Sequence, residues 1–184
     1  MKLKNSTWIL LIAAIVLGTG VYIYETYTKP LQSAQQQQQK RLFSFAAEDI
    51  QTLTIERNGT TLVFQRTGDS NTPWRMTQPE KASASDASLS FLTSLLVDGK
   101  IDRTFSASHS QKSEYGLDNP QGTVKVSLKN GETHRLILGK TDYEDKYLYA
   151  QIDPVENSGQ IGVSLVDKSF QYGIDRSLSE WKNP

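Results

Sequence analysis

The sequence of 184 residues lacks cysteine entirely and contains only two histidines, His109 and His134. The absence of cysteine excludes disulfides, thiolate metal ligands, a cysteine nucleophile and lipid attachment at a processed N-terminal cysteine. The two histidines do not form a pair at zinc-binding spacing. The acidic cluster of Asp142, Glu144 and Asp145 lacks the alternation and the glycine of a calcium loop, so it predicts a solvated turn. We therefore expect no metal site.

The sequence also lacks an excess of charge of either sign, because 20 Lys and Arg residues balance 20 Asp and Glu residues. Its largest basic cluster is Lys40-Arg41, which is too small to attract nucleic acid. The chain has no glycine-rich phosphate loop and no Gly-x-Ser-x-Gly motif. A hydrolase at His109 is a remote alternative, and no spacing rule selects a carboxylate pair for glycoside hydrolysis. We expect a non-enzymatic protein with no cofactor and no nucleic-acid partner.

One long apolar run is present, from Trp8 to Tyr24. It carries no charge, and at about 1.5 Å per helical residue it is just long enough to cross the hydrocarbon layer. Lys2 and Lys4 precede it, which predicts a cytoplasmic N-terminus. The segment after the run lacks the small residues of a cleavage site, which favours a retained anchor over a cleaved signal peptide. Within the span, Gly18 either permits close contact with another membrane helix or is simply tolerated.

The chain is therefore predicted to have three regions. Residues 1–28 form the cytoplasmic start and the transmembrane anchor, which contacts the lipid bilayer through residues 8–24. Residues 29–42 are a Gln-rich linker, whose polar, low-complexity sequence is typical of a spacer. Residues 43–184 form an exported globular domain.

The first part of that domain predicts a β-hairpin. Apolar and polar residues alternate on both sides of Asn58-Gly59, a dipeptide that favours a two-residue type I′ turn. This turn pairs Ile55 with Leu62 and Leu53 with Phe64, which places the apolar side chains on one face.

A second hairpin is predicted around Asn130-Gly131. A two-residue loop would place the apolar residues after the turn on the wrong face, whereas a three-residue loop with a left-handed Gly131 restores one apolar face. The latter register pairs Leu128 with Glu132 and Val126 with His134. Further strands are expected at Trp74 to Met76, ending before Pro79, and at residues 146–152 and 161–166.

One amphipathic helix is predicted between the hairpins. Ser83, with Asp86 three residues later, has the pattern of a helix N-cap, and Asp98-Gly99 marks the end. Leu89, Leu92 and Leu96 recur at helical spacing and are expected to pack on the sheet. A short C-terminal helix is expected from the spacing of Phe170, Ile174, Leu178 and Trp181. The predicted fold class is α+β, a mainly antiparallel sheet of hairpins packed by one amphipathic helix and preceded by one transmembrane helix.

Several stretches of the chain resemble a known family. They are Trp74-Arg-Met-Thr-Gln-Pro79, the helix with Phe91-Leu-Thr-Ser-Leu-Leu96, Glu114-Tyr-Gly-Leu-Asp-Asn-Pro120, Leu138-Gly139 and Tyr147-Leu-Tyr149. Together they resemble a bacterial domain family of unknown function, often encoded near auxiliary parts of ABC transporters and gliding machinery, and most of all its small membrane-anchored members in cyanobacteria. The resemblance covers about Phe43 to Val166, and it implies no catalytic residue.

The most specific of these stretches predicts a turn. Gly116 is expected to take a positive φ, Pro120 to set the entry to the next strand, and Tyr115 and Leu117 to fill the core on either side. The residues Tyr115, Gly116, Leu117, Asp118, Pro120, Trp74 and Trp181 are candidates for a structural role or for an interaction site.

The expected function is that of a non-enzymatic, membrane-anchored accessory or assembly factor of an integral membrane protein complex. The cyanobacterial resemblance implies a domain in the thylakoid lumen or periplasm and suggests a photosystem as the complex. The alternative is a ligand-binding or transporter-associated periplasmic module, which would need an apolar pocket with converging polar groups between helix and sheet.

Overall fold

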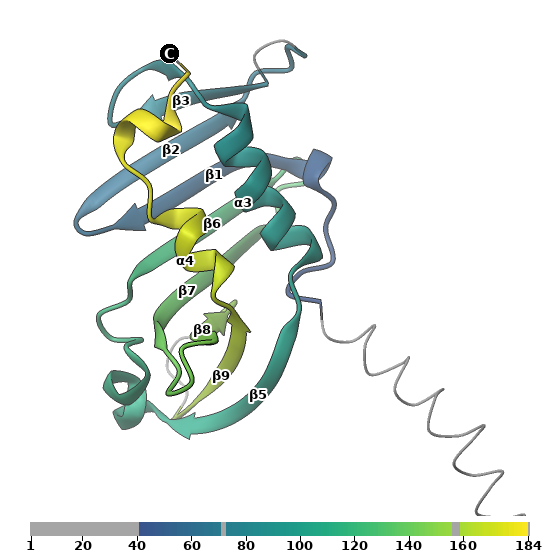
Figure 1. Ribbon diagram of the computed structural model, residues 1–184. Helices are drawn as coiled ribbons and strands as arrows, with labels where there is room; N and C mark the ends of the chain where they lie inside the picture. The colour runs from purple at the N-terminus through teal and green to yellow at the C-terminus, as the bar shows by residue number, and fades with distance from the viewer. Residues whose placement is uncertain (1–40, 71–72, 156–158, 184) are drawn as a thin grey trace, which may run out of the picture. The chain divides into compact units, whose positions relative to one another are not determined.

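Nine strands within the described residues, 41–70, 73–155 and 159–183, form one antiparallel sheet in this computed structural model (Figure 1). The order across the sheet is β4-β3-β2-β1-β6-β7-β8-β9-β5. The strands are β1 (Ile50–Arg57), β2 (Thr60–Arg66), β3 (Trp74–Gln78), β4 (Ala82–Ser83), β5 (Ile101–Ser108), β6 (Gly122–Leu128), β7 (Thr133–Thr141), β8 (Tyr147–Ile152) and β9 (Gln160–Asp167).

Two α-helices, α3 (Asp86–Asp98) and α4 (Ser169–Ile174), cross the same face of this sheet (Figure 1). The described part of the chain also contains three 3₁₀ helices: η2 (Ala47–Asp49), η3 (His109–Tyr115) and η4 (Leu178–Trp181). None of the helices in the described part of the chain is long and apolar enough to cross a membrane. The predicted span from Trp8 to Tyr24, including Gly18, lies outside the described residues, as does most of the linker.

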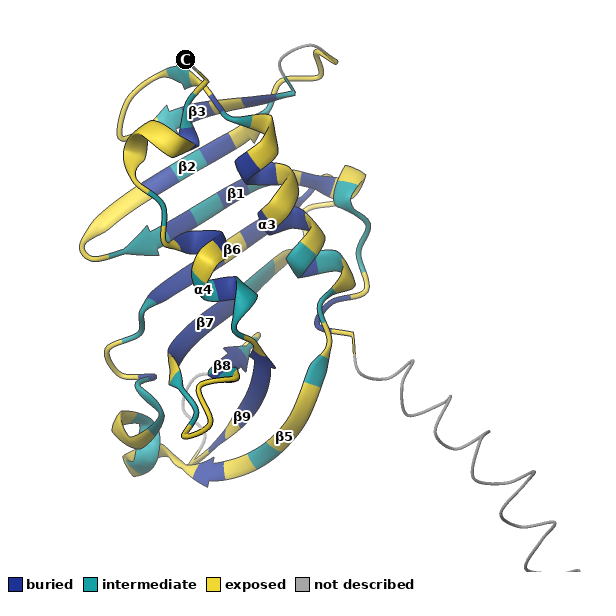
Figure 2. Cartoon of the chain, in the orientation of Figure 1, coloured by how far each residue is buried: buried dark blue, intermediate teal, exposed yellow. Residues whose placement is uncertain are grey.

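The main core lies between the sheet and the helices. Leu89, Leu92 and Leu96 of α3 are fully buried, so the predicted apolar stripe does pack on the sheet. Burial alternates along the strands, as the banding in Figure 2 shows, because every second side chain points toward the helices. Full burial of each such leucine contributes about 1.5–3 kcal/mol of hydrophobic stabilisation.

A second, smaller apolar cluster fills part of the opposite face. Ala107, Leu117, Ile137, Ile161 and Val163 are buried there, and three aromatic side chains pack against them. Apart from Tyr115 and Leu117, its members lie on β5, β7, β8 and β9, so both faces of this half of the sheet carry apolar side chains. Between Ile101 and Arg103 the register of β5 shifts by one residue, which places Arg103, Phe105 and Ala107 on the second face and not on the face of Ile101.

Both predicted hairpins are confirmed. In the first, Leu53 pairs with Phe64 and Ile55 with Leu62, and Asn58 and Gly59 have φ of 49° and 74°, as a type I′ turn requires. In the second, Val126 pairs with His134.

The loop of that second hairpin has the expected geometry. The amide of Leu128 donates to the carbonyl of Glu132 at 2.8 Å, and Gly131 has a φ of 91°. Turn chemistry is local, which is why the sequence specifies it fully.

The predicted start of the long helix is wrong by two residues. Ser83 lies in β4, where it pairs with Arg75 and where its carbonyl accepts from the amide of Asn183 at 3.0 Å. These two contacts hold Ser83 in an extended conformation. The N-cap is Ser85, whose hydroxyl accepts from the amide of Ser88 at 3.4 Å.

The predicted C-terminal helix is also corrected, because it is two separate pieces. α4 ends at Ile174, and η4 begins at Leu178. Between them Asp175 is drawn to Arg57 by an ion pair of 2.6 Å. Ser177 then starts the second piece, since its amide donates to the carboxylate of Glu180 at 2.7 Å.

Candidate functional site

The turn at Gly116 was the most specific candidate from the sequence, and it closes η3. Gly116 has a φ of 67°, and its amide donates to the carbonyl of Ser113 at 3.1 Å. The amide of Leu117 donates to the carbonyl of Lys112 at 2.9 Å. The predicted positive φ is therefore confirmed, and the turn ends the 3₁₀ helix in the manner of a left-handed helix cap.

The residues on either side of Gly116 face the second apolar cluster. The Tyr115 ring lies 5.5 Å from the Phe105 ring and 5.0 Å from the Tyr149 ring, and Leu117 is buried. Gly139 lies against the turn so closely that a Cβ there would collide with the Tyr115 carbonyl oxygen. Three of the resembling stretches thus meet in one packed unit, which supports a structural role for them.

Asp118 and Pro120 finish this unit. Asp118 is exposed, and its carboxylate accepts from the amide of Asn119 at 2.9 Å. Pro120 leads into β6, where the amide of Gln121 donates to the carbonyl of Leu138 at 2.8 Å. Both residues therefore shape the turn.

Trp74 and Trp181 lie inside the main core and not on the surface. Trp74 is 2% exposed, with the Arg66 guanidinium 4.4 Å from its ring centroid. Trp181 is fully buried, and its ring lies 5.2 Å from the Phe64 ring. Neither tryptophan is presented to a partner.

The two histidines have different surroundings. His109 is exposed at the start of η3. His134 is half-buried in β7, as predicted; its ring lies 5.1 Å from the Phe43 ring and 5.2 Å from the Phe45 ring, and its Nδ1 is 2.8 Å from a carboxylate oxygen of Asp153. The ring contacts join the segment before β1 to β7, and the carboxylate contact joins β7 to the residue after β8, so packing accounts for His134.

The acidic cluster forms the β7–β8 turn, as predicted. The Asp142 carboxylate accepts from the amides of Tyr147 and Lys146 at 2.9 Å, and these bonds lower the pKa of Asp142. Asp145 binds Lys168 at 2.6 Å, which raises the pKa of Lys168. Among the described residues no group of three or more side chains of metal-ligand type is gathered in one place.

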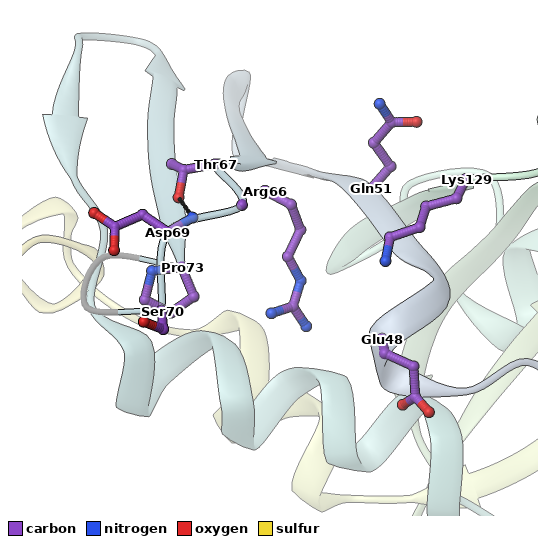
Figure 3. A pocket seen from close by; sticks show the side chains of 9 residues that line it. Glu48, Gln51, Arg66, Thr67, Asp69, Ser70, Pro73 and Lys129 are labelled. Atoms are coloured by element: carbon purple, nitrogen blue, oxygen red, sulfur yellow. Dashed lines mark hydrogen bonds between the residues drawn. The ribbon is translucent and has the colours of Figure 1, made fainter.

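One open hollow lies beside the end of β2 (Figure 3). Its volume is about 590 Å³, and Arg66 and Lys129 line it together with Glu48. The Arg66 guanidinium donates to the carbonyl of Ala47 at 3.1 Å, so it links β2 to η2. The lining contains the carboxylates of Glu48 and Asp69 as well as the two cations, so its charges do not favour an anionic ligand.

A smaller pocket lies where α4 and η4 cover the β1–β2 hairpin. Its volume is about 280 Å³, and its floor consists of the buried side chains Ile55, Leu62 and Ile174. Arg176 and Leu178 form part of its rim. Small-molecule sites usually measure about 300 to 1,000 Å³, so this pocket has the size for one inserted side chain.

Two exposed apolar side chains lie near that pocket: Leu178 lines it, and Phe91 contacts Arg176, which also lines it. Phe91 of α3 is 39% exposed and Leu178 of η4 is 38% exposed. The Arg176 guanidinium lies 5.5 Å from the Phe91 ring centroid and 5.9 Å from that of Trp181, and its buried Nε has no hydrogen-bond partner. We call Phe91, Arg176 and Leu178, together with the pocket, the aromatic–arginine surface.

This surface was not predicted from the sequence. The sequence places Phe91 in a stretch that resembles the family and Leu178 in the predicted C-terminal helix, and no local pattern connects either residue with Arg176. One signal was present, because Phe91 lies next to Leu92 and therefore about 100° away from it around the helix. The contact with Arg176 depends on tertiary packing between α3 and the segment after α4.

The fold defines the class of this protein as an α+β domain built on one antiparallel sheet. Residues 74–184 match the family described as Domain of unknown function (DUF4340), and the chain belongs to that family. No curated protein matches the chain, and no solved structure matches it. The resemblance to a domain family of unknown function is thus confirmed, whereas the cyanobacterial likeness stays a prediction.

Proposed function

We propose that this protein is a non-enzymatic accessory or assembly factor that docks on a membrane protein complex through the aromatic–arginine surface. The observation that carries the proposal is that the exposed Phe91 ring contacts Arg176, which lines a pocket of about 280 Å³ together with the exposed Leu178. Aromatic and arginine side chains next to a pocket are typical of the residues that dominate binding at protein interfaces.

The sequence supports the membrane location. An uncharged run from Trp8 to Tyr24 follows Lys2 and Lys4, and a polar linker separates this run from the domain. A tether of this kind raises the effective concentration of the domain near membrane partners. We propose that the domain lies in the periplasm or thylakoid lumen, and that a cyanobacterial photosystem is one such complex.

A second candidate function is that of a ligand-binding or transporter-associated module. It is favoured by the position of the pocket between α4 and the sheet, with Arg57 and Arg176 at the rim. The small volume and the ion pair of Arg57 with Asp175 favour a protein side chain over a small molecule.

Copurification from the native membrane tests the proposed function. The double variant Phe91→Ala/Leu178→Ala removes two exposed side chains of the surface, and we expect it to lose the integral membrane proteins that wild type retains. Tyr143→Ala is the matched control, because Tyr143 is 89% exposed on the β7–β8 turn and outside the surface. This control should retain the complex.

The result also separates the alternatives. Equal retention of membrane proteins by the double variant and by wild type would exclude docking through this surface. A small molecule that copurifies with wild type and is lost with the double variant would instead establish the ligand-binding function. Replacing residues 8–24 by an unrelated membrane span should leave the retained complex unchanged if the span serves only as a tether.

A further inference from the structure

The two edges of the sheet are treated differently by the rest of the chain. At one edge, β4 has only two residues, and backbone groups after Trp181 cover it. There the amide of Asn183 donates to Ser83, the amide of Ser85 donates to Trp181, and Ala84 forms a bridge with Lys182. This edge is closed against another strand.

The opposite edge is β5, which has eight residues and pairs on one side with β9 (Figure 1). Most of its residues are exposed or partly exposed (Figure 2). An edge strand presents a row of backbone amide and carbonyl groups that another strand can bind. Proteins blunt such an edge by making it short or by placing proline, charges or a bulge in it; β5 is not short and contains no proline, and its bulge and its charges, Asp102 and Arg103, are confined to its first three residues.

One end of this edge already binds backbone. Arg41 forms an antiparallel bridge with Lys100, and the amide of Leu42 donates to the carbonyl of Gly99 at 2.9 Å. At the other end the chain turns into η3 at His109. Among the described residues, no strand pairs with the outer edge of β5 from Ile101 to Ser108.

We propose that β5 of one chain pairs antiparallel with β5 of a second copy, with Thr104 on the two-fold axis. In this register each residue lies opposite the residue equally far from Thr104 in the other copy. Arg103 then faces Phe105 of the second copy, and Phe105 faces Arg103 of the second copy. The two sheets become one continuous sheet with the helices of both copies on the same side.

The side chains of β5 make this pairing self-complementary. Arg103 and Phe105 lie on the same face of the sheet, two residues apart, since they pair with Leu165 and Val163 of β9. Phe105 is half-buried, and its ring lies 5.5 Å from that of Tyr115, so an incoming arginine would cover an aromatic cluster. Arginine over an aromatic ring is attractive, and the two-fold axis produces this contact twice.

Two alternative pairings lack this complementarity. An axis at Arg103 would place two arginines opposite each other, which is destabilising. In a pairing that turns one copy over, Phe105 would lie on the same face of the joined sheet as Thr104 of the other copy. That face is polar here, since the Thr104 hydroxyl lies 3.0 Å from the Ser164 hydroxyl. The register with Thr104 on the axis instead places two threonines opposite each other, which is a favourable cross-strand pair.

The absence of cysteine from the chain gives a clean test. In the full-length protein, in native membranes, Thr104→Cys should form a disulfide between two copies under mild oxidation, because directly opposed residues lie about 4.5 to 5.5 Å apart at Cα. The product is a band at the mass of two chains that disappears on reduction. Ser106→Cys is the matched control. With the axis at Thr104, the residues at position 106 in the two copies lie four residues apart along the paired strands.

A mixing experiment keeps the test valid if Thr104→Cys weakens the fold. Arg103→Cys and Phe105→Cys chains should cross-link efficiently when they are produced together and poorly when each is produced alone. The proposal is overturned if Thr104→Cys yields no dimer band and the mixed chains yield none. It is also overturned if Ser106→Cys cross-links as well as Thr104→Cys, or if the cross-linked species contains a different protein. Because neither readout involves the aromatic–arginine surface, this result is independent of the proposed function.

Discussion

Gly116 is required by two separate features of its position. Its φ of 67° lies in the left-handed region, which favours glycine, and a Cβ at this position would lie 2.8 Å from the amide nitrogen of Lys140. The turn therefore fixes both the direction of the chain after η3 and its distance from β7. Through it, Tyr115 and Leu117 reach the second apolar cluster.

Replacement of Gly116 by valine should lower the free energy of unfolding by about 1 to 3 kcal/mol, because a β-branched residue strains this backbone conformation. The measurement is the denaturation midpoint, with unchanged slope. Gly68→Val is the control, since Gly68 has a φ of 80° but no atom within 4 Å of an added Cβ. Equal losses in the two variants would mean that close packing at Gly116 contributes nothing.

The sequence was informative about Gly116 and not about Gly139. The stretch from Tyr115 to Pro120 contains its own turn signals, so a positive φ could be predicted locally. The need for glycine at position 139 arises from the Tyr115 carbonyl, which lies far away in the chain and close in space. Such a contact is set by tertiary packing, which no local pattern reports.

At the scale of secondary-structure elements, η4 depends on a carboxylate. The amide and the hydroxyl of Ser177 donate to Glu180 at 2.7 and 2.8 Å, and these bonds lower the pKa of Glu180 below its ordinary value of 4.5. A lowered pKa means that the folded state favours the charged form. The stabilising contribution is present above pH 4.5 and is lost as the pH falls through the lowered pKa.

Glu180→Gln should therefore reduce the acid sensitivity of the fold. The amide side chain keeps an acceptor for Ser177 but has no proton to gain, so the melting temperature should fall less steeply below pH 4.5 than in wild type. Thermal melts across a pH series measure this slope. Glu48→Gln serves as the control on η2, and an unchanged slope in Glu180→Gln would rule out the role of this carboxylate.

Elements with local signals were predicted well, and those without them were missed. Both hairpins follow from the Asn-Gly turns, and α3 follows from its leucine spacing. β5 was not predicted, because only Ile101, Phe105 and Ala107 are apolar and its burial depends on β9. The break between α4 and η4 was missed because the Arg57–Asp175 ion pair joins distant parts of the chain.

At the scale of the whole molecule, the sheet order could not be read from the sequence. β1 lies between β2 and β6, and β5 leaves α3 to pair with β9 at the far edge. Of the candidate site, the sequence identified the Tyr115 turn as structural. It did not identify the aromatic–arginine surface, whose three side chains come from segments joined only in the folded chain.

The family match begins at Trp74, whereas the fold requires the preceding strands. β1 and β2 connect β3 to β6, and Leu53, Ile55 and Phe64 are fully buried in the main core. A chain that begins at Trp74 should therefore fail to melt cooperatively, whereas a chain that begins at Arg41 should do so. Circular dichroism during heating distinguishes them. Cooperative melting of the shorter chain would show that the matched segment is a domain by itself.

Site-specific photo-cross-linking in intact native membranes tests most directly whether this domain docks on a membrane protein. A photo-reactive phenylalanine analogue at position 91 should capture an integral membrane protein. The same analogue at Thr61, which is exposed on the sheet face opposite α3, should capture none. Capture of the same protein from both positions, or from Thr61 alone, would contradict docking through Phe91, Arg176 and Leu178.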